Sequence, residues 1–174
     1  MSLLSWNCRG VGGPQEPTFQ RLTELRCTYF PEIFFLMETM EHHNTLVDLQ
    51  CWLWYDRMYT VDPLNRCVGG GWWGGGGCLS LFWKNNIEVE VLYADKNILD
   101  VKIIYEDKQF HLSSVYGNPS FSIRHLVWEH LLIIGVNRSG SWCMFGDFNE
   151  ILNNSEKIGG PRRNDSTFHA FGNA

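Results

Sequence analysis

Continuous apolar runs alternate along the chain with segments in which apolar residues recur every three or four positions. Runs of strand length cover 3–7, 32–38 and 142–152, and such runs are typical of strands that are covered on both faces. Between the first two runs, the spacing of apolar residues predicts an amphipathic helix over 18–30, which Pro31 ends. The amino-terminal part therefore predicts a strand, a helix and a second strand.

The central part predicts shorter strands joined by tight turns. Turn-like pairs such as Asn85-Asn86 separate them, so consecutive strands are expected to pair antiparallel. These strands are predicted at 79–83, 87–93, 99–105 and 110–116.

The remaining segments predict helices and one further strand. A short helix is expected over 41–49, an aromatic-rich strand over 52–60, and the beginning of a helix over 166–171. A longer helix is expected over 123–136. Its apolar stripe comprises Ile123, Leu126, Val127, Leu131 and Ile134. Helices mixed with an antiparallel centre favour an α+β fold in which two packed sheets lie between outer helices.

Composition limits the classes of protein that fit. The 174 residues are 44% hydrophobic, which suffices for one packed domain over 1–174. A formal charge of -5 argues against binding nucleic acid by bulk electrostatics. Any phosphate contact therefore needs a local site or a cation. The glycine-rich segment 67–78 lacks the Lys-Ser/Thr ending of a P-loop and reads instead as a flexible hairpin connection.

Cysteine usage and the chain start bear on the compartment. The six cysteines form no Cys-x-x-Cys pair, so buried thiols in a reducing compartment are expected. The start has no basic region and no apolar run of signal-peptide length, and no segment has the roughly 20 apolar residues that a membrane span needs. We expect an intracellular protein, nuclear or cytoplasmic, without membrane contact; the sequence indicates no protein partner.

Polar side chains stand at the ends of several apolar runs. They are Asn7, Glu38, Tyr116, Asp147 and Asn149. Strand ends gather at one edge of a sheet, so these side chains are expected in one cleft. Asp147 and Asn149 are two apart, which would place them on one side of an extended chain. Two carboxylates with oxygen-rich neighbours favour a hard cation such as Mg²⁺. The plainer alternatives are an Asx turn at Asp147, a water-facing Glu38 and a half-buried rim tyrosine at Tyr116.

Four segments, in order, resemble a known family. They are Trp6-Asn7, Phe35-Leu36-Met37-Glu38-Thr39, Val115-Tyr116-Gly117-Asn118-Pro119 and Gly146-Asp147-Phe148-Asn149-Glu150-Ile151-Leu152. Together they resemble the signatures of the endonuclease/exonuclease/phosphatase superfamily. The segments 6–10, Arg124 with Trp128-Glu129, and 156–160 look most like the endonuclease domain of plant LINE-type (non-LTR) retrotransposons.

The resemblance implies a four-layered α/β/β/α sandwich (DNase I-like) and Mg²⁺-dependent phosphodiester hydrolysis, with Mn²⁺ as a possible substitute. It implies Glu38 as metal ligand, Asn7 beside metal and phosphate, and Asp147 as the residue that orients or deprotonates the attacking water. Asn149 and Tyr116 would be donors to the phosphate in the transition state. Contacts to phosphate or DNA would come from Arg124, Asn118 and Arg9, although for Arg124 a solvent-exposed position on a helix face is favoured.

The chain also departs from the family pattern. It stops before the expected strands that carry an Asp and an Asp-His pair, and Arg9 stands where some relatives have an acidic residue. The expected fold is therefore incomplete at the carboxyl terminus, with unpaired edge groups on the second sheet. The leading hypothesis is a truncated, weakly active or inactive DNA endonuclease. The alternatives are a non-catalytic remnant of such a domain and a phosphatase of small phosphoesters or inositol phosphates.

Overall fold

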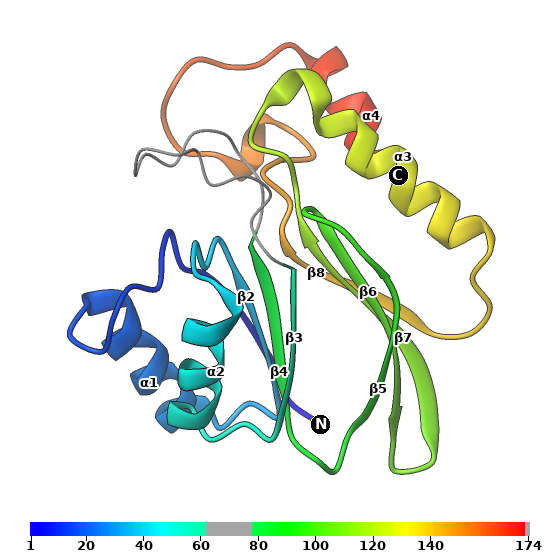
Figure 1. The fold of residues 1–174 in the computed structure, drawn as a ribbon. Helices are drawn as coiled ribbons and strands as arrows, with labels where there is room; N and C mark the ends of the chain where they lie inside the picture. Colours follow the sequence, from blue (N-terminus) through cyan, green and yellow to red (C-terminus); the bar gives the residue numbers. More distant parts are fainter. Residues whose placement is uncertain (62–77, 173–174) are drawn as a thin grey trace.

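Two four-stranded sheets lie face to face between two layers of helices in the computed structural model, which describes residues 1–61 and 78–172 (Figure 1). The strand orders are β1-β2-β4-β3 and β5-β6-β7-β8. The first sheet contains β1 (Leu3–Asn7), β2 (Ile33–Met37), β3 (Arg57–Val61) and β4 (Leu79–Trp83). The second contains β5 (Glu88–Ala94), β6 (Ile98–Tyr105), β7 (Lys108–Tyr116) and β8 (Trp142–Asp147). This arrangement confirms the predicted α/β/β/α sandwich.

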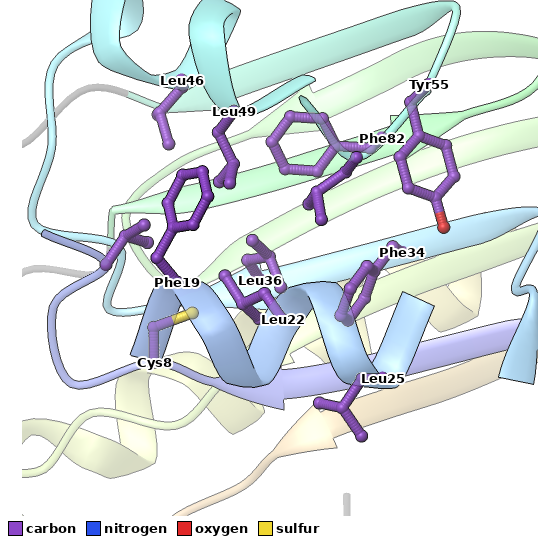
Figure 2. Packing of buried hydrophobic residues seen from close by; sticks show 12 residues of the cluster. Cys8, Phe19, Leu22, Leu25, Phe34, Leu36, Leu46, Leu49, Tyr55 and Phe82 are labelled. Carbon is purple, nitrogen blue, oxygen red and sulfur yellow. The ribbon is translucent and has the colours of Figure 1, made fainter. Parts of the chain in front are cut away.

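The first helical layer consists of α1 (Pro17–Tyr29) and α2 (His43–Trp52), which cover the outer face of the first sheet (Figures 1 and 2). Phe19, Leu22 and Leu25 of α1 are buried against this sheet, as the helical spacing predicts. Pro17 stands in the first turn, where its missing N–H costs nothing, and Phe30 ends the helix in the left-handed conformation just before Pro31. Burying each such apolar side chain stabilises the fold by about 1.5–3 kcal/mol.

The interface between the two sheets forms a second core. Ile33, Phe35 and Met37 of β2 face residues of the second sheet such as Leu99 and Leu112. Because Phe34 and Leu36 pack on the opposite face against the helices, β2 is buried along its whole length. The continuous apolar run that predicts a strand covered on both faces is thereby confirmed.

The other helical layer is formed by α3 (Phe121–Val136), with the short helix α4 (His169–Gly172) beside it (Figure 1). The α3 residues that are buried differ in part from the predicted stripe: Ile123 and Leu126 are exposed, and Arg124 and Trp128 are buried instead. Apolar residues occur nearly all round this helix, so hydrophobic spacing alone does not identify the buried face. The buried polar contacts of Arg124, described below, fix it.

The parallel strand pairs determine where the polar strand ends meet. β1 pairs parallel with β2, and β7 pairs parallel with β8. In register, Asn7 stands opposite Met37, and Tyr116 stands opposite Asp147. Since β8 also contacts β1 and β2, the carboxyl ends of these four strands converge from both sheets.

The structure corrects several predictions about elements. β4 and β5 are consecutive but lie in different sheets, because the link at Asn85-Asn86 crosses between them. The segment predicted as a strand from Trp52 onward begins with the end of α2, and the strand starts only at Arg57. β8 ends at Asp147 rather than at Leu152.

Exposure also differs from prediction at β8 and at the cysteines. Cys143 and Met144 of β8 are exposed, because this strand lies at the edge of its sheet among the described residues. Cys27 and Cys51 are exposed as well, so among the cysteines that the structure describes the expectation of buried thiols holds only for Cys8 and Cys78. The glycine-rich connection and Cys67 lie outside the described residues. Over 1–61 and 78–172, no helix is long and apolar enough to cross a membrane.

Candidate active site

A single side-chain amide joins the two carboxylates of the site. Asn7 Nδ2, at the end of β1, donates to Glu38 Oε1 at 3.0 Å and to Asp147 Oδ2 at 3.2 Å. Glu38 follows β2 in the first sheet, and Asp147 ends β8 in the second. Residues more than a hundred positions apart therefore share one neutral donor. The predicted convergence of these strand ends is confirmed.

Glu38 is held in place by backbone conformation and by a phenol. Its φ of 52° is left-handed, which turns the chain sharply at the end of β2. Tyr116, at the end of β7, donates its hydroxyl hydrogen to Glu38 Oε1. Tyr116 is buried, with 4% exposure, rather than a half-buried rim residue. Burial, followed by the hydrogen bond to Glu38, raises the pKa of Tyr116 above its ordinary value. The phenol thus stays a hydrogen-bond donor at neutral pH.

Asp147 and Asn149 are brought together by a turn and not by extended chain. Asn149 has a φ of 52°, and its backbone N–H donates to Asp147 Oδ1 at 2.9 Å. This is the Asx turn that the sequence leaves as an alternative. Asn149 Nδ2 donates to the Gly117 carbonyl at 2.8 Å, and the Gly117 N–H donates to the Asp147 carbonyl at 2.8 Å. The turn is thereby tied to the end of β7.

Two glycines allow this close approach of backbones. A Cβ at Gly117 would overlap the Phe148 carbonyl, and a Cβ at Gly146 would overlap the Val115 carbonyl. Gly146 also has a φ of 137°, which side chains rarely adopt. Phe148 itself packs against Trp128 and Phe171, so it points into packing as predicted.

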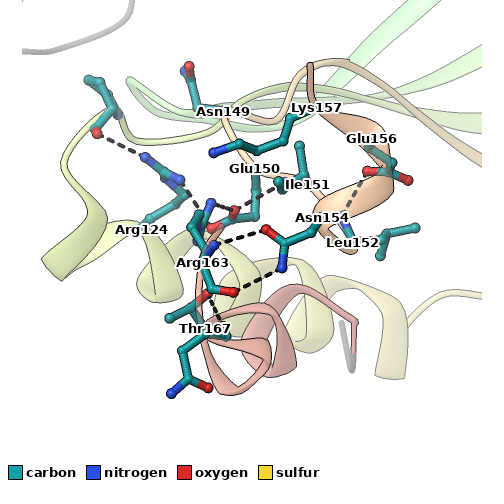
Figure 3. Close-up of polar contacts among 12 residues, drawn as sticks. Arg124, Asn149, Glu150, Ile151, Leu152, Asn154, Glu156, Lys157, Arg163 and Thr167 are labelled. Atoms are coloured by element: carbon teal, nitrogen blue, oxygen red, sulfur yellow. Dashed lines mark hydrogen bonds and ion pairs between the residues drawn. The ribbon is translucent and has the colours of Figure 1, made fainter. Parts of the chain in front are cut away.

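The residue after Asn149 carries a contact that the sequence does not single out. The Glu150 side chain is 3% exposed and accepts from Arg124 Nη1 at 3.1 Å and from Arg163 Nη1 at 2.6 Å (Figure 3). Burial alone would raise the pKa of Glu150, but the hydrogen bond from Arg163 and the neighbouring positive charges outweigh it and lower that pKa. Two arginines from distant segments thus hold the loop that contains Asn149. The sequence gives no sign of these two ion pairs, because a single Glu after the Asp-Phe-Asn motif does not indicate which residues it contacts.

The predicted exposure of Arg124 is wrong. Arg124 is buried, donates from Nε to the Asn118 carbonyl at 2.6 Å and from Nη2 to the Pro119 carbonyl at 2.9 Å, and pairs with Glu150. Its guanidinium therefore ties the loop after β7 to the loop after β8. The helical pattern places Arg124 on α3 but carries no information about these backbone acceptors.

Asn118 and Arg9, the other predicted phosphate contacts, differ from each other. Asn118 is buried, and its Oδ1 accepts from the Ser120 N–H at 2.9 Å, so it shapes the turn before α3. Arg9 is exposed in a left-handed conformation, with its N–H donating to Asn7 Oδ1 at 3.2 Å. Of the three predicted phosphate contacts, only Arg9 is exposed.

The donor atoms fit a hard cation. Glu38 and Asp147 supply carboxylate oxygens; the Asn7 Nδ2 faces both of them, and the Asn7 amide oxygen accepts from the Arg9 N–H. The described residues contain no group of three or more His, Cys, Asp or Glu side chains placed to hold a metal ion. Mg²⁺ commonly binds through one or two carboxylates, with water and substrate phosphate completing its shell. The site suits that mode rather than a closed protein cage.

Comparison with known families identifies the class of protein. The model of the endonuclease/exonuclease/phosphatase family matches residues 4–173. The chain belongs to this family. A comparison with curated protein sequences gives no match.

Solved structures share the fold at low sequence identity. A humanized TDP2 from D. rerio is 14% identical with a TM-score of 0.62, over 87% of this chain and 63% of its own. The 3′ phosphatase NExo from Neisseria, bound to a product DNA hairpin, is 10% identical with a TM-score of 0.59, over 89% of this chain and 60% of its own. The human Nocturnin catalytic domain, with bound sulfate, is 18% identical with a TM-score of 0.58, over 86% of this chain and 65% of its own. The chain thus spans less than two thirds of each of these structures.

Proposed function

We propose that the chain carries a Mg²⁺-dependent site for phosphodiester hydrolysis, with DNA as substrate. The observation that carries the proposal is the Asn7 amide, which joins Glu38 of one sheet to Asp147 of the other. Two carboxylates that share a donor at converging strand ends make a site for a cation and a phosphate.

Each side chain has a proposed role in this reaction. Asp147 orients the attacking water and accepts its proton; its two oxygens are already fixed by Asn7 and by the Asn149 N–H. Tyr116 turns its hydroxyl from Glu38 to a phosphate oxygen as charge develops there. Asn149 uses one amide hydrogen for the Gly117 carbonyl, which leaves the second hydrogen for the phosphate.

Glu38 would hold the cation, with Asn7 beside it. When bound, Mg²⁺ (or Mn²⁺) supplies charge that polarises the phosphoryl oxygen and neutralises the leaving oxyanion. The protein's part is to keep Glu38 in place, which the left-handed backbone and the Tyr116 hydroxyl do. Burial and the Glu38 charge raise the pKa of the Cys8 thiol to about 12.

Two observations favour DNA over other phosphoesters. The segments 6–10 and 156–160, and Arg124 with Trp128-Glu129, resemble the endonuclease domain of LINE-type retrotransposons. The NExo structure is bound to a product DNA hairpin, and a second D. rerio TDP2 structure that shares the fold, distinct from the humanized one, is complexed with a single-stranded DNA product. We infer a retrotransposon-type endonuclease as the origin of the chain.

A nicking assay on supercoiled DNA tests this function. In Mg²⁺ the wild type should nick above background and should lose nicking when EDTA is added. Asp147→Ala and Glu38→Ala should each lower the rate at least about 10²-fold, because each removes a group that acts on the transition state. Lys108→Ala, at the far end of β7, should match the wild type. Equal background in the wild type and both alanine variants would reject catalysis and leave a non-catalytic remnant.

Substrate class is tested separately. Abasic-site DNA should be hydrolysed in preference to inositol phosphates, in a manner that depends on Asp147. If only inositol phosphates were hydrolysed, and Asp147 were needed for it, the proposed catalytic site would stand but its substrates would be small phosphoesters rather than DNA.

A further inference from the structure

A polar pocket lies on the tail beyond the active-site loop. Its volume is about 530 Å³. It is lined by Asn153, Asn154, Ser155, Arg162, Arg163, Asn164 and Asp165. The lining contains two guanidinium groups and one carboxylate, so positive charge exceeds negative charge there. The chain as a whole has a net charge of -5. The proposed hydrolysis uses none of these residues.

The pocket is a built feature and not a loose loop. Asn154 Oδ1 accepts from the Arg163 N–H at 2.9 Å, and Asn154 Nδ2 donates to the Arg163 carbonyl at 2.9 Å (Figure 3). The Arg163 guanidinium lies over the Phe121 and Phe168 rings, with Cζ 5.4 and 5.0 Å from their centroids. This pairing and stacking fix the arginine from both ends.

One donor in the pocket wall lacks an acceptor. Arg163 Nη1 bonds Glu150, but Arg163 Nη2 is buried and has no hydrogen-bond partner among the described residues. A buried, charged donor without an acceptor is costly. Arg162 is exposed, and no side-chain partner is seen for it in the described part of the chain. The exposed Arg162 guanidinium therefore supplies the donors that a ligand in the pocket can reach, and they match a phosphate group in geometry and charge.

The pocket is directly connected to the active-site loop. Arg163 contacts Glu150, which follows Asn149 in the same loop (Figure 3). A DNA strand carries a phosphate about every 3.4 Å along the helix axis, so a strand held at Asp147 has further phosphates nearby. A single nucleotide or a small phosphoester has none to place there.

We propose that the pocket at Arg162 and Arg163 binds a backbone phosphate of a DNA strand, away from the phosphate that is hydrolysed. This inference rests on the proposed function and specifies its substrate as a polynucleotide. The local positive charge offsets the repulsion between the acidic site and the DNA backbone, which the net charge of -5 would otherwise leave unopposed.

The role of the pocket is tested by measuring DNA binding under conditions in which the DNA is not cleaved. Anisotropy of a labelled DNA oligonucleotide is measured in EDTA over a series of salt concentrations. Arg162→Ala should weaken binding severalfold and lower the slope of log K against log salt by about 0.7–0.9, the contribution of one phosphate contact. Arg162→Lys should restore most of the slope, and the charge-matched control Lys108→Ala should leave it unchanged.

Several results would overturn the inference. They are a wild type that does not bind the oligonucleotide, and Arg162→Ala behaving like Lys108→Ala. Inorganic phosphate is the second probe: it should displace DNA from the wild type more than chloride of equal ionic strength does, but not from Arg162→Ala. Phosphate that acts on the wild type only as chloride does would also overturn the inference. Failure here together with Asp147-dependent nicking would leave the proposed hydrolysis standing, so the two failures are distinguishable.

Discussion

At the scale of single residues, the site depends on positions where the backbone allows no side chain. Gly117 lies against the Phe148 carbonyl, next to the turn that carries Asn149. The sequence identifies the polar residues at the strand ends but not the left-handed conformations of Glu38 and Asn149. A local Asx turn contributes to the Asn149 conformation, but the hydrogen bonds that tie Asn149 to Gly117 and Glu38 to Tyr116 are tertiary, and local patterns do not encode them.

Gly117→Ala should separate the loops after β7 and β8. The added methyl group forces the Phe148 backbone away, which should cost about 1–3 kcal/mol of unfolding free energy and abolish any nicking. Urea denaturation and the nicking assay measure the two effects. Gly13→Ala is the matched control, because a Cβ there meets nothing within 4 Å. Equal stability of the two variants would contradict the close approach at Gly117.

At the scale of elements, Glu150 joins three segments: α3 through Arg124, the loop after β8, and the tail through Arg163. Glu150→Gln removes the charge that compensates a buried arginine, which should cost on the order of 3 kcal/mol. Glu24→Gln on α1 is the matched control. Its partner Arg21 is 53% exposed and Glu24 itself 64% exposed, so the loss should stay within about 0.5 kcal/mol. Urea denaturation measures both losses. Similar losses in the two variants would show that the contacts of Glu150 with Arg124 and Arg163 do not hold these segments together.

The lowered pKa of Glu150 predicts that the unfolding free energy depends on pH in the acid range. The pKa of Glu150 is lower in the folded chain than its ordinary value of 4.5. Its contribution to stability is therefore complete above that ordinary value and is lost as pH falls through the folded value. Between neutral pH and acid, the wild type should lose more unfolding free energy than Glu150→Gln does. Parallel curves for the two proteins would show that Glu150 makes no such contribution.

Element prediction from the sequence succeeds where periodicity and chain breakers agree. β1, β2, α1 and the antiparallel run from β5 to β7 are confirmed within a residue or two. The sequence does not predict that β4 and β5 lie in different sheets. A short, turn-like link is compatible both with a hairpin and with a connection that crosses between packed sheets. The exposure of β8 was missed because an apolar run does not show whether its strand has neighbours on both sides.

At the scale of the whole molecule, the fold brings together residues that the sequence keeps far apart. The four-layer arrangement follows from the order of helices and strands together with the family motifs, and it delivers Asn7, Glu38, Tyr116 and Asp147 to one place. Charged groups elsewhere, such as the Arg124 and Arg163 pair on Glu150, have no motif of their own. They emerge only when α3 and the tail are packed together.

The central claim is that Glu38 and Asp147 lie at one site, where Glu38 holds the cation and the negative charge of Asp147 stands beside it, and thermal unfolding in Mg²⁺ tests it most directly. At about a hundredfold excess over Kd, Mg²⁺ should raise the wild-type midpoint by about 5–10 °C relative to NaCl of equal ionic strength. The isosteric variants Glu38→Gln and Asp147→Asn should lose most of that rise, whereas Glu24→Gln should keep it. A wild-type midpoint unchanged by Mg²⁺, or an equal rise in all four proteins, would contradict the claim.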